Sequence, residues 1–506
     1  MLFLSSWAVW GSVQPVDLRC EYRVDPLGID NVQPRLSWKI LDPDKTRGQR
    51  QTGYQVLVAS SLEKLNQDIG DLWDSGAVKE SQSANNVYQG ASLKSGMECL
   101  WKVRICDIDG KVSDWSPVAR FTVGLLDSTD WKGEWILKED QLKTDHNWYR
   151  KNFTLSAEPT SGFVYVASFG YHELYVNGRK VTDQVMNPVS SYMKKRIPYL
   201  TYDISAHLKK GDNVIAVWHA AGWARWRRIR EYRNIPFVFK AQAEIEVGNE
   251  RLSFGSDTSW KCKKSHTEYY GDWDILRFGG ETIDDRRKED DWNTAVYDDR
   301  NWANAVVYDA AELNAKIPEG DNISFALNSN KDRSLRSLYS PIKAELSAQM
   351  VEPQVRFKEI APIEVKDNKD GTYRIDMGEN YTGFFEMNLY DGAEGDSVIF
   401  EISDQTELVM NWKQKSQYIF GKSGKGRFTN RFNLAGGRWI TVYGLNYKPK
   451  LEDIKGYVIT NDRKQISTFE SSNELLNKIY KINHCHPIDI EKKGWHVPLK
   501  SSTRRV

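Results

Sequence analysis

The chain has 506 residues, which is more than one hydrophobic core usually supports, so its length predicts about three domains. Its 70 Lys and Arg residues balance 69 Asp and Glu residues, and this near-neutral charge argues against a nucleic-acid-binding protein. The 19 Trp and 24 Tyr residues are many for a polar chain. Aromatic rings stack on sugars but also fill the cores of β-sandwiches, so composition alone leaves both uses open.

Residues 1–14 begin with an apolar run that is too short to span a bilayer and lacks the basic start of a secretory signal. A signal peptide clipped by a wrong start codon and an ordinary terminus are both open interpretations. The five cysteines form no CxxC pair and have no histidine at zinc-ligand spacing, so neither a metal site nor a disulfide framework is predicted. Cys99 and Cys106 fit on one strand, but their odd spacing places them on opposite faces.

Residues 15–125 are predicted to form a β-sandwich that resembles a fibronectin type III module, because short alternating runs are separated by turn residues. Trp38, Tyr54 and Trp101 are interpreted as its core. Residues 128–312 continue in the same pattern, and Asn177-Gly178 between two short apolar runs predicts a tight hairpin.

A polar segment at residues 313–336 is expected to be a linker. Residues 337–467 are predicted to form a further β-sandwich. Residues 468–506 differ, because residues 471–482 carry a helical stripe and Ser471 and Glu474 have capping-box spacing. The stripe needs a partner surface, and the tail after it has no period that could supply one. The sequence therefore predicts a chain truncated at the start of a helical domain.

Short motifs follow one another along the chain at residues 17–22 (DLRCEY), 34–38 (PRLSW), 47–60, 72–76 (LWDSG), 174–178 (LYVNG), 279–286 (GGETIDDR) and 376–380 (DMGEN). In sequence and order, these motifs resemble those of the bacterial α-L-rhamnosidases of the large inverting class. Each motif alone is a weak signal, but the series covers nearly the whole chain.

This resemblance implies an all-β fold of tandem β-sandwich domains. A fibronectin III-like domain is followed by a jelly-roll domain implicated in carbohydrate binding and by a third sandwich. An (α/α)6 barrel carries catalysis in the family, and residues 468–506 look like the first helix of that barrel. Residues 496–506 of this chain depart from the pattern of the family. This departure is a further reason to expect a truncation.

The activity implied by the resemblance is inverting hydrolysis of terminal non-reducing α-L-rhamnose from glycans or glycosides. Because the barrel is absent, the chain is expected to be inactive alone, and whether it is an enzyme stays open. A stand-alone carbohydrate-binding, lectin-like protein is the alternative, and a decayed gene product is a third. The expected partner is a rhamnose-containing carbohydrate, with no nucleic acid and no membrane span, in the periplasm or outside the cell.

No catalytic residue is assigned in this chain. Inversion needs two carboxyl groups about 6.5 to 9.5 Å apart, one as acid and one as base. The best acidic cluster is Glu281, Asp284 and Asp285, but its motif faces other modules or the substrate approach in the family. These side chains are therefore interpreted as a turn cluster bonded to neighbouring backbone.

Residues 222–233 interleave aromatic side chains with five arginines and are the local exception to charge neutrality. A nucleic-acid patch, a sugar-contacting loop and an inter-domain contact are the three interpretations. For the sugar-contacting loop, the candidate carbohydrate-binding residues are Trp223, Trp226 and Arg225, with an indole stacking on the sugar.

No cofactor is predicted from the residues. Some members of the family bind rhamnose through calcium in the jelly-roll domain, so calcium stays open there. Residues 289–291 and 298–299 offer clustered carboxylates of the kind that calcium takes, without EF-hand spacing. Solvated loops are the alternative and the favoured interpretation.

Overall fold

The computed structural model describes residues 13–193, 195–225, 235–274, 277–316, 339–405, 412–461 and 468–480. The chain divides into two compact units, residues 1–131 with 200–202 and residues 132–199 with 203–506. Most of the apolar N-terminal run and most of the expected linker lie outside the described residues. Among the described residues, no helix is long and apolar enough to cross a membrane.

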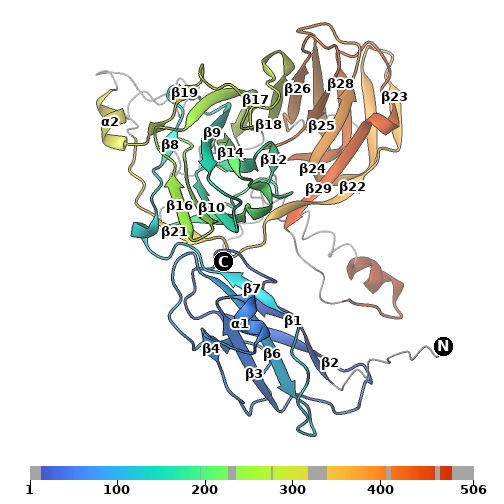
Figure 1. Cartoon of the computed structure of the whole chain (residues 1–506). Coiled ribbons are helices and arrows are strands. Elements are labelled where there is room, and N and C mark those ends of the chain that lie inside the picture. The colour runs from blue at the N-terminus through green and yellow to red at the C-terminus, as the bar shows by residue number, and fades with distance from the viewer. Residues whose placement is uncertain are drawn as a thin grey trace, which may run out of the picture. The chain divides into compact units, whose positions relative to one another are not determined.

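The first unit is a sandwich of two β-sheets, as its alternating sequence predicts (Figure 1). One sheet has the order β1-β2-β5 and the other has the order β4-β3-β6-β7. The elements are β1 (Gln14–Cys20), β2 (Arg35–Leu41), β3 (Gly53–Ala59), α1 (Leu62–Asn66), β4 (Trp73–Asp74), β5 (Asn86–Val87), β6 (Glu98–Cys106) and β7 (Ala119–Thr122). A short 3-10 turn, η1 (Ser128–Asp130), follows.

Aromatic residues form the core of this first sandwich. Trp38 and Trp101 are buried, which confirms their expected role. Tyr54 is only partly buried and packs edge-on against Trp38, with ring centroids 5.2 Å apart. Cys99 and Cys106 both lie on β6 and are free thiols, as are Cys20 and Cys262. Cys485 lies outside the described residues.

The second unit begins with a jelly roll (Figure 1). Its seven-stranded sheet has the order β20-β8-β15-β10-β13-β21, with β16 paired to β15. The strands of this part are β8 (Ile136–Leu137), β9 (Asp145–Leu155), β10 (Ser161–Ser168), β11 (Tyr171–Val176), β12 (Arg179–Lys180), β13 (Arg196–Asp203), β14 (Gly211–Ala220), β15 (Phe239–Val247), β16 (Glu250–Gly255), β17 (Lys261–Asp274), β18 (Arg277–Asp284), β19 (Ala303–Asn304), β20 (Val306–Val307) and β21 (Glu345–Ala348). Short helical turns connect them, namely η2 (Ser205–His207), η3 (Gly222–Arg225), η5 (Asp285–Arg287) and α2 (Ala310–Ala315).

The other sheet of the jelly roll continues without a break into the third sandwich. Its fifteen described strands include the path β12-β11-β14-β9-β17-β18-β26-β25-β28-β24-β29-β22. The strands of the third sandwich are β22 (Gln354–Ile360), β23 (Glu364–Asp367), β24 (Tyr373–Leu389), β25 (Ser397–Ser403), β26 (Lys415–Ile419), β27 (Gly426–Thr429), β28 (Ala435–Tyr443) and β29 (Ile454–Asn461), with the turn η6 (Leu451–Asp453). The two expected sandwiches therefore share one sheet.

The junction of this shared sheet explains one of the family-like motifs. Strand β18, which carries residues 279–284 of the GGETIDDR motif, pairs in parallel with β26. A side chain at Gly280 would place its Cβ only 2.0 Å from the carbonyl oxygen of Lys415. The motif needs glycine there because the backbones of the two sandwiches approach each other closely.

The hairpin between β11 and β12 has the turn that Asn177-Gly178 predicts. Both residues have positive φ, 48° for Asn177 and 85° for Gly178, and they connect the pair Val176 and Arg179. Such a two-residue turn with both residues in the left-handed region is the primed type that fits the twist of a hairpin.

Replacing Gly178 with alanine is therefore expected to cost about 1 to 2 kcal/mol of unfolding free energy, because alanine resists this φ. Its Cβ would also approach the Cγ2 of Thr294 at 3.1 Å. Denaturant unfolding followed by tryptophan fluorescence checks this loss. Gly178→Asn is the matched variant, since asparagine tolerates positive φ and should lose less; equal stability of the alanine variant and the parent would contradict the assignment.

The helical segment near the C-terminus begins later than its sequence suggests. Residues 474–480 are helical, and the side chain of Asn473 accepts the amide protons of Leu475 and Leu476 at 2.9 and 3.3 Å. Asn473 is thus the N-cap, and the capping box expected from Ser471 and Glu474 is wrong. Asparagine and serine both cap well, so sequence spacing alone could not separate them.

Candidate functional site

The residues proposed for sugar contact do not form an exposed aromatic platform at the described positions. Trp223, on η3, is completely buried, and its indole nitrogen donates a hydrogen bond to the carbonyl oxygen of Pro188 at 3.3 Å. Its ring packs at 6.1 Å from that of Phe169. A sugar cannot reach either face of this ring in the structure. Trp226 and the side chain of Arg225 lie outside the described residues, so their role stays a prediction.

Tryptophans fill the core of the jelly roll. Trp148, on β9, stacks on Trp292 with ring centroids 4.8 Å apart and planes 14° from parallel. It also stacks on Trp302 at 6.0 Å and meets Trp218 edge-on at 5.5 Å. All four side chains are buried. Much of the aromatic excess that composition left open is therefore used in packing.

The acidic cluster of the GGETIDDR motif is bonded to the protein. Glu281 is buried, and its carboxylate accepts the backbone amide protons of Arg431 and Phe432 at 2.7 and 2.6 Å. Burial raises the pKa of Glu281 to about 7. Asp284 accepts two hydrogen bonds from the guanidinium of Arg286, both at 2.9 Å.

Asp285, the third member of that cluster, accepts a hydrogen bond from the hydroxyl of Tyr418 at 2.6 Å. Burial is the main cause that raises its pKa. Each of the three carboxyl groups thus has a partner in the fold. The turn-cluster interpretation fits only Asp284, which bonds to the amide and the guanidinium of Arg286 in its own turn. The partners of Glu281 and Asp285 belong to the third sandwich, so these two carboxyl groups bond the jelly roll to that sandwich.

Most of the carboxylates considered for calcium are likewise paired with basic or hydroxyl side chains. Glu289 contacts Lys263 and the hydroxyl of Tyr297. Asp298 pairs with Arg300 at 2.7 Å, and Asp299 pairs with the buried Arg150 at 3.3 Å. Within the part of the chain that the structure describes, no group of three or more His, Cys, Asp or Glu side chains could hold a metal ion. Calcium therefore has no residue assignment.

A buried ion cluster joins the jelly roll to the third sandwich. Glu173, on β11, accepts hydrogen bonds from the amine of Lys180 at 2.6 Å and the hydroxyl of Tyr175 at 2.7 Å. Arg431, from the third sandwich, pairs with the same carboxylate and donates to the hydroxyl of Tyr175 at 3.0 Å. Its guanidinium lies over the ring of Trp218, 3.9 Å from the centroid.

In this cluster, the neighbouring charges affect the pKa of Glu173 more strongly than burial does. Burial alone would raise the pKa of Glu173, but the positive charges of Arg431 and Lys180 hold that pKa at about 2. The same carboxylate raises the pKa of Arg431 against the effect of burial. Both side chains are therefore charged at neutral pH, and each depends on the other.

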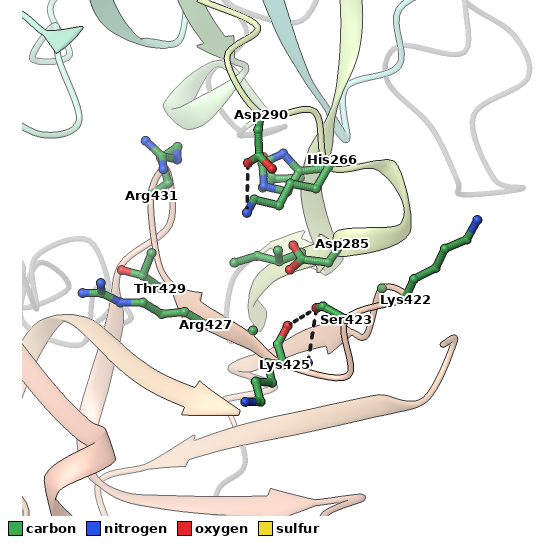
Figure 2. Close-up of a pocket in the computed structure, with 14 residues that line it drawn as sticks. His266, Asp285, Asp290, Lys422, Ser423, Lys425, Arg427, Thr429 and Arg431 are labelled. Carbon is green, nitrogen blue, oxygen red and sulfur yellow. Dashed lines mark hydrogen bonds and ion pairs between the residues drawn. The ribbon is translucent and has the colours of Figure 1, made fainter. Parts of the chain in front are cut away.

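A cavity of about 530 Å³ lies beside this cluster (Figure 2). One wall comes from β17, β18 and the η5 turn and includes His266, Asp285 and Lys288. The other wall comes from the loop between β26 and β27 and the start of β27, within residues 421–427, together with Thr429 and Arg431. No aromatic side chain other than the imidazole of His266 lines the cavity. The chemistry available there is cationic and polar.

Three family models match successive parts of the chain. Residues 15–127 match the Rha78A-like N-terminal immunoglobulin domain, and residues 157–325 match the alpha-L-rhamnosidase N-terminal domain. Residues 366–460 match the bacterial alpha-L-rhamnosidase concanavalin-like domain. The chain belongs to the bacterial α-L-rhamnosidase family. The resemblance carried by the sequence motifs is confirmed, and so is the all-β fold of tandem sandwiches.

Curated relatives and solved structures agree with this family. An alpha-L-rhamnosidase from Formosa agariphila is 27% identical over 93% of this chain and 51% of its own length. The alpha-L-rhamnosidase structure from Dictyoglumus thermophilum is 29% identical, with a TM-score of 0.78 over 92% of this chain and 51% of that one. The Streptomyces avermitilis alpha-L-rhamnosidase complexed with L-rhamnose, 19% identical with a TM-score of 0.74, covers 93% of this chain and 59% of that one and shares the fold. This rhamnosidase-family chain spans about half the length of the curated relatives it matches.

Arg431 and the basic loop before β27 were not predicted from the sequence of this rhamnosidase-family chain. The run Gly421-Lys422-Ser423-Gly424-Lys425-Gly426-Arg427 is visible as a glycine-rich basic segment. That signal could have marked it as a surface loop. Nothing in the local sequence could place it opposite the η5 turn, because the two segments are more than 130 residues apart.

Proposed function

We propose that this chain is the β-sandwich portion of an α-L-rhamnosidase that hydrolyses terminal non-reducing α-L-rhamnose from glycans or glycosides. The observation that carries the proposal is the succession of three rhamnosidase-family models along one chain. The relatives' names supply the activity, and a rhamnose-containing carbohydrate is the corresponding substrate. Such substrates lie outside the cytoplasm, so we place the protein in the periplasm or the medium.

Within that enzyme, the β portion has a structural role and does not carry out the hydrolysis. The carboxyl groups of the GGETIDDR motif are all bonded to neighbouring protein groups, which leaves them to structure. Helix 474–480 exposes Leu475, Leu476 and Ile479 by 64%, 47% and 44%, as expected of a helix that packs on further helices. The catalytic pair would then belong to that helical part.

The chain alone is expected to release no rhamnose from an aryl α-L-rhamnoside above a mock preparation. The assay is colorimetric, and an intact α-L-rhamnosidase assayed in parallel shows that the substrate is competent. Rhamnose release by the purified chain would place catalysis in the β portion and overturn the assignment of roles.

The DNA beyond the codon for Val506 tests the whole-enzyme proposal independently. A neighbouring reading frame that encodes a long helical repeat would support an α-L-rhamnosidase. Unrelated DNA would favour the carbohydrate-binding alternative, in which recognition of a sugar is the whole function. A shift of the melting temperature by rhamnose, with and without calcium, measures that binding directly.

A further inference from the structure

The cavity beside the ion cluster is lined by an excess of positive charge. Lys288, Lys422, Lys425, Arg427 and Arg431 line it, against two carboxylates. Among these cations, Arg427 and Arg431 have fixed carboxylate partners in Glu386 and Glu173.

The two lysines of the loop between β26 and β27 have no such partner. Within the described residues, the amines of Lys422 and Lys425 make no hydrogen bond or ion pair, and both side chains are exposed. Figure 2 shows both side chains on this loop, extending in different directions from it. Their charges are therefore available to a ligand.

The loop that carries these lysines is packed closely against its neighbours. A Cβ at Gly421 would lie 2.8 Å from the carbonyl oxygen of Asp285, and a Cβ at Gly426 would lie 1.5 Å from the hydroxyl oxygen of Tyr418. The hydroxyl of Ser423 also donates to the carbonyl oxygen of Lys425 at 2.8 Å. The lysines thus extend from a backbone whose position is fixed by contact with the jelly-roll turn, which lowers the entropic cost of binding.

The imidazole of His266, in the wall opposite this loop, lies in the positive field of Arg431 and Lys288. The ring of His266 packs against Trp148 and Trp218, with centroids 5.5 and 5.4 Å away, and its Nδ1 has no hydrogen-bond partner among the described residues. Burial, together with the nearby charges of Arg431 and Lys288, lowers the pKa of His266 to about 3. The imidazole is therefore neutral at physiological pH and offers a hydrogen bond without adding charge.

The two carboxylates of the lining offset only part of this field, since they face five cations. The hydrogen bond from the hydroxyl of Tyr418 to Asp285 comes from a neutral group and leaves the charge of this carboxylate in place. Asp290 pairs with Lys288 at 3.1 Å, but its side chain is 78% exposed. An exposed pair of this kind contributes little and can exchange for a ligand's charge.

We propose that this cavity binds the acidic group of a sugar, a uronate carboxylate or a sulfate ester. Ammonium and guanidinium groups form charge-assisted hydrogen bonds with such oxyanions. The volume of about 530 Å³ fits a short oligosaccharide. A neutral sugar would find no indole or phenol ring to stack on in this lining. The inference rests on the proposed function in that the acidic sugar would belong to the rhamnose-containing glycan.

Titration calorimetry of the full chain at low salt tests this site. The probes are D-glucuronate, glucose 6-sulfate, neutral D-glucose and inorganic sulfate. We expect millimolar binding of at least one acidic sugar, no binding of glucose, and a loss of at least tenfold in affinity in the double variant Lys422→Gln/Lys425→Gln. The tighter of the two acidic probes identifies carboxylate or sulfate as the natural group.

The matched control is Lys450→Gln, which removes an exposed lysine elsewhere on the third sandwich and should leave affinity unchanged. Binding that is absent for both acidic sugars, or equal in the double variant and the parent, overturns the proposal. If inorganic sulfate binds as tightly as both acidic sugars, the cavity is a site for anions only. This outcome would overturn the proposal that it recognises a sugar. Because no hydrolysis is measured, acidic-sugar binding can succeed even where the rhamnosidase proposal fails.

Discussion

Replacing Arg431 with methionine is expected to lower the unfolding free energy of the second unit by about 3 to 5 kcal/mol. The variant leaves the buried carboxylate of Glu173 without its principal counter-charge, with only Lys180 and the hydroxyl of Tyr175 as partners. It also removes the guanidinium that lies 3.9 Å from the ring centroid of Trp218. Chemical denaturation followed by tryptophan fluorescence measures the loss.

The matched control is Arg300→Met, which removes an arginine paired with Asp298 at an exposed position of the same unit, with side chains 87% and 56% exposed. A solvent-exposed ion pair contributes little to stability, so this control should unfold almost as the parent does. Adding Glu173→Gln to Arg431→Met should recover part of the loss, because the buried carboxylate is then removed and only the partly exposed ammonium of Lys180 remains charged. Equal stability of Arg431→Met and Arg300→Met would show that the cluster does not hold the two sandwiches together.

The second large effect is a steep loss of stability in mild acid. His172, His219 and His266 each have a pKa lowered from 6.5 to about 3, chiefly by burial. Between these values the unfolded chain binds more protons than the folded chain, so the unfolding free energy falls as the pH falls from 6.5 to 3. Glu281 acts in the opposite direction, because its pKa is raised from 4.5 to about 7 and the folded chain binds its proton more tightly.

Three histidines against one glutamate leave a net difference of about two protons between pH 4.5 and 6.5. That difference corresponds to roughly 3 kcal/mol lost per pH unit on acidification. Melting curves over this range measure the slope. His219→Phe, which keeps a ring against Phe237 and Phe239, should reduce the slope by about one proton. Arg300→Met, which retains all three imidazoles, should keep the parent slope. A slope unaltered in His219→Phe would contradict the buried, neutral state of this side chain.

Local sequence patterns were sufficient for the secondary structure of most of the chain. The alternation around Tyr54 and Trp101, and the Asn177-Gly178 turn, depend on neighbours along the chain, so they could be predicted without tertiary contacts. The N-cap was misplaced by two residues because Ser471 and Asn473 carry equally good caps, and only their hydrogen bonds distinguish them.

The candidate site could not be predicted in the same way. Trp223 sits in a run of aromatic and basic residues that suits a binding loop, but the surrounding strands bury its ring completely. Burial of a single side chain depends on what packs over it from distant segments. The cavity has the same origin, because His266 and Lys425 come from different sandwiches.

The sequence by itself determined the class of this protein: β-sandwiches in series, a helical segment near its C-terminus, and the ordered motifs of the α-L-rhamnosidase family. These features reside in short-range periodicity, turn residues and motif order. Tertiary structure alone decided that two sandwiches share one sheet through β18 and β26, and that Arg431 pairs with Glu173 across 258 positions. A contact over that separation depends on the folding of everything between its partners, so no local pattern encodes it.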